Sequence, residues 1–188
     1  MLLEVDKMLL TSGTLEPAGD FALLKSGSEL DKTWKFSCGH VVGQDNFKAI
    51  CVGNGFDFRY QQRNDKNQLH KVVEFINHTA SLQNKTIAGG LIVFVQSYGY
   101  QKVLKQFIET NCEQGLLRDK EVVYWESQGN QDAFTNYSKR IKEERALAIL
   151  ICVIGGKLSE GINFSDDLAR TVIVLGLPYP SNKSQSIQ

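Results

Sequence analysis

The sequence has 188 residues, of which 42% are hydrophobic and 22% charged, a composition typical of a globular protein of one domain or slightly more. The sequence has 21 lysine and arginine residues and 21 aspartate and glutamate residues, so it has no net positive charge that would attract a polyanion. Apolar runs are too short to cross a bilayer, and the acidic start MLLEVD does not match a secretory signal, so a cytosolic or nuclear protein is expected.

The first 33 residues offer little regular structure. Residues 8–14 read as the end of a strand followed by the polar turn Thr-Ser-Gly-Thr, and Pro17 closes this segment. One strand cannot bury both of its faces, so we expect it to dock on a sheet or to belong to a longer protein. Residues 18–33 are polar and contain glycine, which predicts a linker.

The next segment predicts strands and then one helix. Residues 34–63 have β-like patterning with turns at Gly43 and at 53–55. Apolar residues then recur at helical spacing over 65–82, with Asp65 as the expected N-cap. His70 and His78 fall outside the apolar face of this helix and are predicted at the surface.

From Gly89 onward, strands alternate with helices. We predict strands over 91–95, 121–125, 146–154 and 170–177, and helices from Ser97 toward Gly115 and over 131–145. The strands are continuously apolar, as a sheet covered on both faces requires. This order predicts parallel βαβ units with helices on both faces.

Cysteine spacing does not indicate a metal site or a disulfide scaffold, because the sequence has no C-x-x-C pair and no matching histidine pair. The segment Cys38-Gly39-His40 reads as a strand and turn, since two potential ligands do not complete a tetrahedral site.

The loop GGKLSEGINF, residues 155–164, follows the most apolar strand. Ligands of open parallel sheets bind beyond the carboxyl ends of the strands, where this loop begins. Lys157 and Ser159 are suited to a phosphate, and a short helix beginning near Ser159 would offer N–H groups to an anion. The Walker A pattern fails, because Ile151 and Leu158 stand where it needs Gly and Ser or Thr. A nucleophile elbow fails as well, and a purely structural turn is the alternative.

Polar residues also follow the other strands. Ser97 and Tyr98 come after the first strand of the alternating region, where capping and packing are the simpler explanation. Glu126 and Ser127 follow the second strand, as a polar contact or merely a turn. Together with the turn at 11–14, these groups predict a polar edge along one end of the sheet.

Four segments carry a resemblance to a known family. LLTSGTLEP (9–17), WKFSCGHVV (34–42), GGLIVFVQSYGY (89–100) and GGKLSEGINFSDDLARTVIVLGLPYP (155–180) together resemble the XPD-like iron–sulfur DNA helicases of superfamily 2. FSCGHVV and SEGINFSDDL look most like the chromosome-loss helicase branch, which is associated with sister-chromatid cohesion.

The resemblance implies an α/β fold: a RecA-like parallel sheet with helices on both faces, which is the second helicase domain. A β-rich connector and a remnant of the first RecA-like domain would precede it. Residues 1–17 would end the first domain at motif III, 18–84 would be the linker, connector and helix, and 85–188 would be the second domain, truncated before motif VI.

The resemblance also assigns roles by motif. Motif III, which couples hydrolysis to strand movement, matches Thr11, Ser12, Gly13 and Thr14. The residues implied in DNA binding are Ser97, Tyr98, Lys157 and Ser159, and those implied in nucleotide binding are Glu160, Gly161 and Asn163. Many family members have Asp where Asn163 stands, so a metal-linked role is not expected there.

The implied function is ATP-dependent movement along single-stranded or forked DNA, in the nucleus. ATP, magnesium and an iron–sulfur cluster would serve the intact parent, but this chain has no Walker motifs, cluster cysteines or arginine-finger segment, and alone we expect it not to hydrolyse ATP. The implied partners are the first RecA-like domain and cohesion or replication proteins.

Two other functions compete with this one. The first is a non-catalytic module that binds nucleic acid or a helicase partner. The second is a small-molecule Rossmann enzyme, which is disfavoured because no G-x-G-x-x-G follows a strand.

Overall fold

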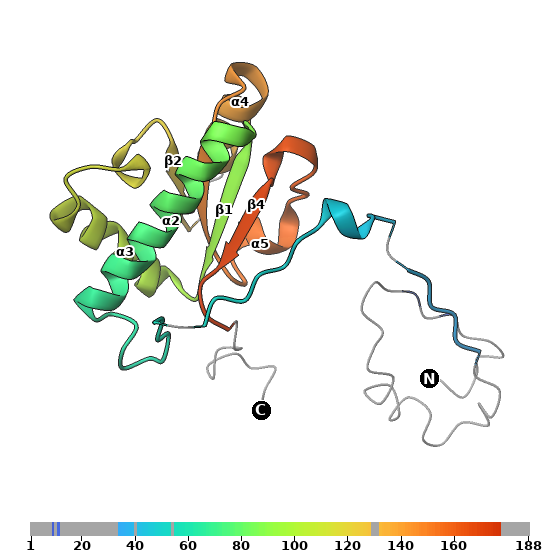
Figure 1. The fold of residues 1–188 in the computed structure, drawn as a ribbon, viewed down its shortest axis with the longest axis horizontal. Helices are drawn as coiled ribbons and strands as arrows, with labels where there is room; N and C mark the ends of the chain where they lie inside the picture. Colours follow the sequence, from blue (N-terminus) through green and yellow to red (C-terminus); the bar gives the residue numbers. More distant parts are fainter. Residues whose placement is uncertain are drawn as a thin grey trace. The chain divides into compact units, whose positions relative to one another are not determined.

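The computed structural model describes residues 9, 11, 34–39, 41–53, 55–128 and 132–177. The chain divides into two units, Met1–Ile50 and Cys51–Gln188. The second unit carries the sheet and every helix longer than one turn among the described residues (Figure 1).

The described residues of 34–63 form no strand, in contrast to the β-rich connector that we predicted. In the first unit they contain one short 3-10 helix, η3 (Gln44–Asn46), and apolar side chains such as Trp34 and Phe47 are exposed. In the second unit, Phe56 packs edge-on against Phe75 of the following helix, with 5.7 Å between ring centroids. Phe56 thus packs on a helix and does not pair with a neighbouring strand.

The sheet contains four parallel strands in the order β2-β3-β1-β4. Their bounds are β1 (Gly90–Val95), β2 (Val123–Trp125), β3 (Ala148–Val153) and β4 (Thr171–Val174). All six residues of β3 are buried, because helices cover both faces of this central strand. The strands and their parallel arrangement confirm the α/β fold that the sequence predicted.

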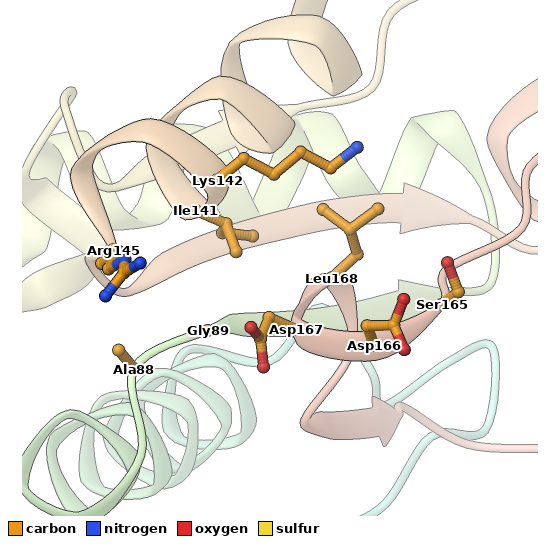
Figure 2. Close-up of a pocket in the computed structure, with 9 residues that line it drawn as sticks. All are labelled: Ala88, Gly89, Ile141, Lys142, Arg145, Ser165, Asp166, Asp167 and Leu168. Carbon is orange, nitrogen blue, oxygen red and sulfur yellow. The ribbon is translucent and has the colours of Figure 1, made fainter.

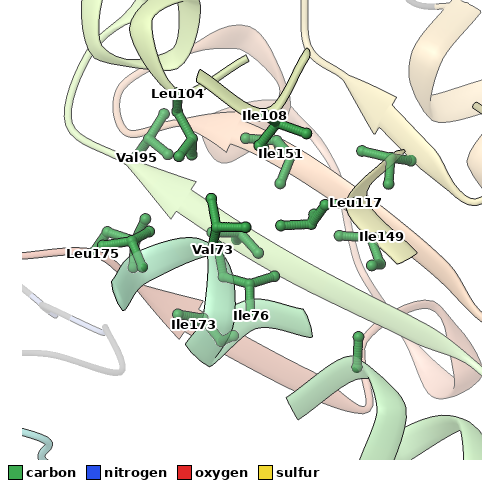
Figure 3. Close-up of a cluster of buried hydrophobic side chains, with 14 of the residues drawn as sticks. Val73, Ile76, Val95, Leu104, Ile108, Leu117, Ile149, Ile151, Ile173 and Leu175 are labelled. Carbon is green, nitrogen blue, oxygen red and sulfur yellow. The ribbon is translucent and has the colours of Figure 1, made fainter. Parts of the chain in front are cut away.

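Helices α2 (Lys66–Thr86) and α3 (Tyr98–Asn111) cover one face of the sheet (Figure 1). Their apolar stripes pack on the odd-numbered residues of the strands, and Figure 3 shows the centre of this cluster around Ile76, Leu104 and Ile151. Asp65 caps α2 as predicted, since its carboxylate accepts hydrogen bonds from the N–H groups of Asn67 and Gln68. The helix at 65–82 thus belongs to the core of the sheet.

Helix α4 (Asp132–Glu144), the short helix α5 (Lys157–Gly161) and the 3-10 turn η5 (Asp166–Leu168) lie on the other face. Even-numbered strand residues such as Leu150 and Cys152 point into this layer, where Tyr137 is fully buried. The two central strands β1 and β3 therefore send alternate side chains into two separate cores, whereas Val172 and Val174 of the edge strand β4 are exposed.

Several boundaries differ from the sequence prediction: α2 extends to Thr86, and β2, β3 and β4 are shorter than the predicted runs. Helix α3 ends at Asn111, and Gly115, with φ of 119°, precedes the next turn η4 (Leu116–Arg118). Its conformation favours glycine, but it serves the turn and not the helix end. Helix α5 begins at Lys157, two residues before the predicted start.

Candidate functional site

Turns after three strands meet at one end of the sheet, which we call the carboxyl rim: residues 96–98, 126 and 154–159. The hydroxyl of Tyr98, after β1, donates a hydrogen bond to Oε1 of Glu126, after β2, at 3.1 Å. The same carboxylate accepts hydrogen bonds from the N–H groups of Val153 at 2.7 Å and Leu158 at 3.2 Å, before and after the turn that follows β3. Part of the polar edge that the sequence predicted is therefore a connected network, whereas residues 12–14 of the turn at 11–14 lie outside the described residues.

Local sequence explains how the carboxylate reaches this position. Glu126 continues the β2–β3 ladder through its own N–H, which donates to the carbonyl of Ile151 at 3.0 Å. The turn after β3 then needs Gly155, whose φ is 72°, and Gly156, which lies directly against the Glu126 carboxylate. A strand end and a diglycine turn thus place a buried acid below the loop.

The Glu126 side chain is 3% exposed, so the network forms away from water. Burial, followed by the hydrogen bond to Glu126, raises the pKa of Tyr98 to about 12. Burial and then the Glu126 charge raise the pKa of the Cys152 thiol as well. At neutral pH the Tyr98 hydroxyl and the Cys152 thiol are therefore both protonated.

Two N–H groups and one hydroxyl of the loop donate hydrogen bonds within the protein. The Leu158 N–H serves Glu126, the Ser159 N–H donates to the carbonyl of Gly156 at 3.1 Å, and the Ser159 hydroxyl donates to the same carbonyl at 2.8 Å. A helix near Ser159 was expected to offer N–H groups to an anion; α5 has five residues, and the Leu158 N–H is not available because an internal carboxylate accepts its hydrogen bond.

Lys157 is the rim's exposed cation. Within the part of the chain that the structure describes, its ammonium has no hydrogen bond or ion pair. Leu158 beside it is 1% exposed and packs in the α4 layer. Ile162 and Phe164 are partly buried and also pack there, so the loop returns to the core after its polar residues.

The other predicted site residues divide into three groups. Ser97 caps α3, with its hydroxyl oxygen accepting from the N–H of Tyr100 at 3.2 Å, so the simpler capping explanation holds for that oxygen. Asn163 is exposed, and Glu160 and Gly161 contribute backbone to α5, the side chain of Glu160 lying outside the described residues. Thr11 is exposed in the first unit, whereas Ser12, Gly13 and Thr14 fall outside the described residues.

Sequence reasoning missed a second contact at the rim. The guanidinium of Arg63 donates to the side-chain oxygen of Gln96 at 2.6 Å and stacks 4.9 Å from the Tyr60 ring centroid. This links the turn before α2 to the end of β1. A single arginine in a polar turn carries no periodic signal, whereas the position of Glu126 directly after a buried strand indicates a polar contact without naming its partners.

The opposite end of the sheet has a hollow of about 480 Å³ (Figure 2). We call its lining the amino rim: Ala88, Gly89, Ile141, Lys142, Arg145, Ser165, Asp166, Asp167 and Leu168. Its charges are exposed, and Asp167 pairs with Arg170 on the surface at 2.5 Å. The hollow lies at the end of the sheet that does not carry the predicted motif residues.

The residues at the carboxyl rim suit an anionic group better than a metal. Lys157 provides a cation, but among the described residues no cluster of three or more histidine, cysteine, aspartate or glutamate side chains could hold a metal ion. Cys38 and Cys51 are exposed, Cys112 is half-buried and Cys152 is buried in the sheet. In the described part of the chain, no helix is both long enough and apolar enough to span a membrane.

Comparisons with known proteins agree with this architecture. Residues 81–188 match the model of a helicase C-terminal domain, which is more than half of the chain. The ATP-dependent DNA helicase CHL1 of Eremothecium gossypii is 36% identical over 183 residues, covering 95% of this chain and 22% of the relative. CHL1 of Candida albicans is 37% identical over 182 residues, covering 93% of this chain and 21% of the relative.

A vertebrate relative matches over the same region. The ATP-dependent DNA helicase DDX11 of Danio rerio is 30% identical over 205 aligned positions, covering all of this chain and 23% of the relative. The chain thus spans a little over a fifth of the length of the curated relatives it matches. With the parallel sheet and the loop after β3, these matches establish that the chain belongs to the XPD-like DNA helicase family and contains its helicase C-terminal domain.

Proposed function

We propose that this chain acts as the second RecA-like lobe of an ATP-dependent DNA helicase, and that its carboxyl rim faces DNA and nucleotide. The observation that carries the proposal is the convergence of three strand ends on Glu126, with Lys157 exposed on the loop above it. The relatives are named ATP-dependent DNA helicases, which supplies the activity that a whole protein of this kind would perform.

Lys157 would contact a phosphate of single-stranded DNA, because a charge-assisted hydrogen bond to an exposed ammonium requires no rearrangement of the loop. Tyr98 would present ring surface near the strand, with its hydroxyl held by Glu126. The hydroxyls of Ser97 and Ser159 already have partners within the protein, so their support for DNA would be secondary.

Glu160, Gly161 and Asn163 would face the nucleotide, and residues 11–14 would couple the two lobes. ATP supplies the free energy of hydrolysis when it is bound between the lobes. The described residues fit a role in contacting its polar groups, and they do not fit a role in holding magnesium or an iron–sulfur cluster. Both groups would therefore belong to other parts of the whole helicase.

The division of the chain follows the same proposal. Residues 1–17 would end the first lobe, 18–84 would connect the lobes, and 85–188 would form the second lobe. Single-stranded or forked DNA would be the substrate, the nucleus the location, and cohesion or replication proteins the partners.

Titration of a fluorescein-labelled oligothymidylate with the 188-residue chain, followed by fluorescence anisotropy at several salt concentrations, tests the proposal. Replacing Lys157 with alanine should weaken binding and reduce the slope of log affinity against log salt by about one, because one phosphate contact is lost. Lys142→Ala is the matched control, since Lys142 is an exposed lysine at the amino rim. Equal effects of the two substitutions, or no binding by the unmodified chain, would contradict the proposal.

A further inference from the structure

We infer that Glu126 is a positioning residue: its buried carboxylate fixes the loop after β3 so that Lys157 is presented to the phosphates of single-stranded DNA. This inference rests on the proposed function, because it assigns a cause to the placement of the cation at the same rim. It adds a residue that lies outside the motif segments from which the candidate site was predicted.

The contacts of Glu126 come from three separate parts of the chain: Tyr98 after β1, Val153 in β3 and Leu158 in α5. Its Oε2 accepts from the N–H of Val153, the last residue of β3, and its Oε1 accepts from the N–H of Leu158, in the first turn of α5. Both N–H groups are buried, and these contacts span 27 and 32 positions of sequence. One carboxylate thus holds both ends of the four-residue turn 154–157.

Lys157 lies directly beside one of these attachment points. Its neighbour Leu158 is held twice, by its N–H at Glu126 and by its side chain in the α4 layer. Because both interactions point inward, the Lys157 side chain is left on the solvent side of the loop. Glu126 therefore determines where the ammonium is, although its own side chain is 3% exposed and does not reach solvent.

Gly156 fits the same arrangement from the other side. A Cβ atom at this position would lie 2.6 Å from Oε1 and 2.9 Å from Oε2 of Glu126, and both distances are shorter than a non-bonded contact of a Cβ atom allows. The same Cβ would lie 2.9 Å from the Val153 carbonyl oxygen, so both the turn and the carboxylate need a residue without a side chain at 156. Two independent substitutions, one on each side of this contact, can disturb the loop.

The hydrogen bonds of the Glu126 carboxylate also limit which groups of the loop are available to a ligand. The Leu158 N–H that could otherwise meet a phosphate already serves Glu126, so a ligand at this loop depends more on the Lys157 side chain. Tyr98 adds a third donor to Glu126 and connects the loop to the start of α3. Glu126 acts here through Lys157 and Tyr98 and does not touch the ligand itself.

A double-mutant cycle tests this inference on the 188-residue chain with a fluorescein-labelled oligothymidylate. Lys157→Ala should lower the affinity roughly five- to tenfold at low salt, the effect of one charge-assisted contact. In the Glu126→Gln background, Lys157→Ala should lower it by less than about twofold, because the amide places an N–H₂ group against an N–H donor and releases the loop. Gly156→Ala should reproduce the result of Glu126→Gln.

Tyr137→Phe is the control for a loss of stability alone, since it removes a buried hydrogen bond to the Leu168 carbonyl at the other end of the sheet. In that background Lys157→Ala should keep its full effect. Full additivity of Glu126→Gln and Lys157→Ala, in variants that remain folded by circular dichroism, would overturn the inference.

Amide hydrogen exchange separates this inference from the proposed function. The N–H groups of Val153 and Leu158 should be protected in the unmodified chain and should exchange at least about tenfold faster in Glu126→Gln and Gly156→Ala. Unchanged protection of both amides would refute the positioning role. If the unmodified chain does not bind the oligonucleotide, the proposed function fails, and the exchange rates still decide whether Glu126 holds the loop.

Discussion

The two ends of the sheet differ in how they hold charge. The amino rim surrounds a hollow of about 480 Å³, but its ionic groups are exposed, and its pair between Asp167 and Arg170 lies on the surface. The carboxyl rim buries a carboxylate and satisfies it with an O–H and two N–H donors. A buried acid with every oxygen hydrogen-bonded is costly to assemble, so it indicates a built site more strongly than the size of a hollow does.

The largest expected effect falls on the carboxyl rim. Glu126→Ala should lower the free energy of unfolding by about 3 kcal/mol, because it leaves the buried N–H groups of Val153 and Leu158 without an acceptor. Urea denaturation measures this change. Glu121→Ala, an exposed acid five positions earlier, should change stability by less than about 0.5 kcal/mol. If Glu126→Ala lowers the free energy of unfolding as little as Glu121→Ala does, water replaces the carboxylate as the hydrogen-bond acceptor, and this would contradict the prediction.

A smaller effect is expected beneath the amino rim. Tyr137→Phe should cost about 1–2 kcal/mol in the same urea experiment, because the Leu168 carbonyl loses the hydroxyl that donates to it inside the protein. This change should leave oligonucleotide binding unaltered. Weaker binding in this variant would remove the functional distinction between the two rims.

The decrease in the free energy of unfolding at alkaline pH should depend on Tyr98. Its pKa is raised to about 12 in the folded protein, above the usual value of 10.0, so the protonated phenol stabilises the fold. This contribution is complete below about pH 10 and is lost as the pH rises toward 12. Tyr98→Phe should therefore make the loss of stability over that range less steep, although Tyr100, whose pKa burial also raises to about 12, keeps part of it. Urea unfolding at a series of alkaline pH values measures the difference, and identical slopes would contradict the burial of the Tyr98 hydroxyl.

The smallest effect is expected from the surface ion pair. Arg170→Ala removes the partner of Asp167, and the two side chains are 45% and 62% exposed. Its cost should be below about 0.5 kcal/mol and should decrease further with added salt. A cost above about 1 kcal/mol would show that the amino rim is organised as tightly as the carboxyl rim.

Much of the fold could be predicted because its signals are local or periodic. The continuous apolar run at 146–154 predicted the central strand β3, and the stripe with Asp65 before it predicted α2. Strands were wrongly predicted for the described residues of 34–63. In part of this segment, aromatic residues occur because extended chain packs on a helix. Phe56 against Phe75 is such a case.

The site could be predicted only in outline. That polar turns after parallel strands gather at one end follows from topology, and Lys157 followed from the loop sequence. The role of Glu126 did not follow, because its hydrogen bonds join residues 27 to 32 positions apart and depend on how β2 and β3 align. Its neighbour Ser127, equally polar in the sequence, is exposed.

The most direct test asks which end of the sheet meets nucleic acid. Amide chemical shifts of the isotope-labelled 188-residue chain, recorded as an oligothymidylate is added, report this residue by residue. We expect the largest changes at 97–98, 126 and 155–159, and small changes at 88–89, 145 and 165–168. Changes concentrated around the amino rim, with the carboxyl rim unaffected, would contradict the assignment of the carboxyl rim as the face that contacts DNA.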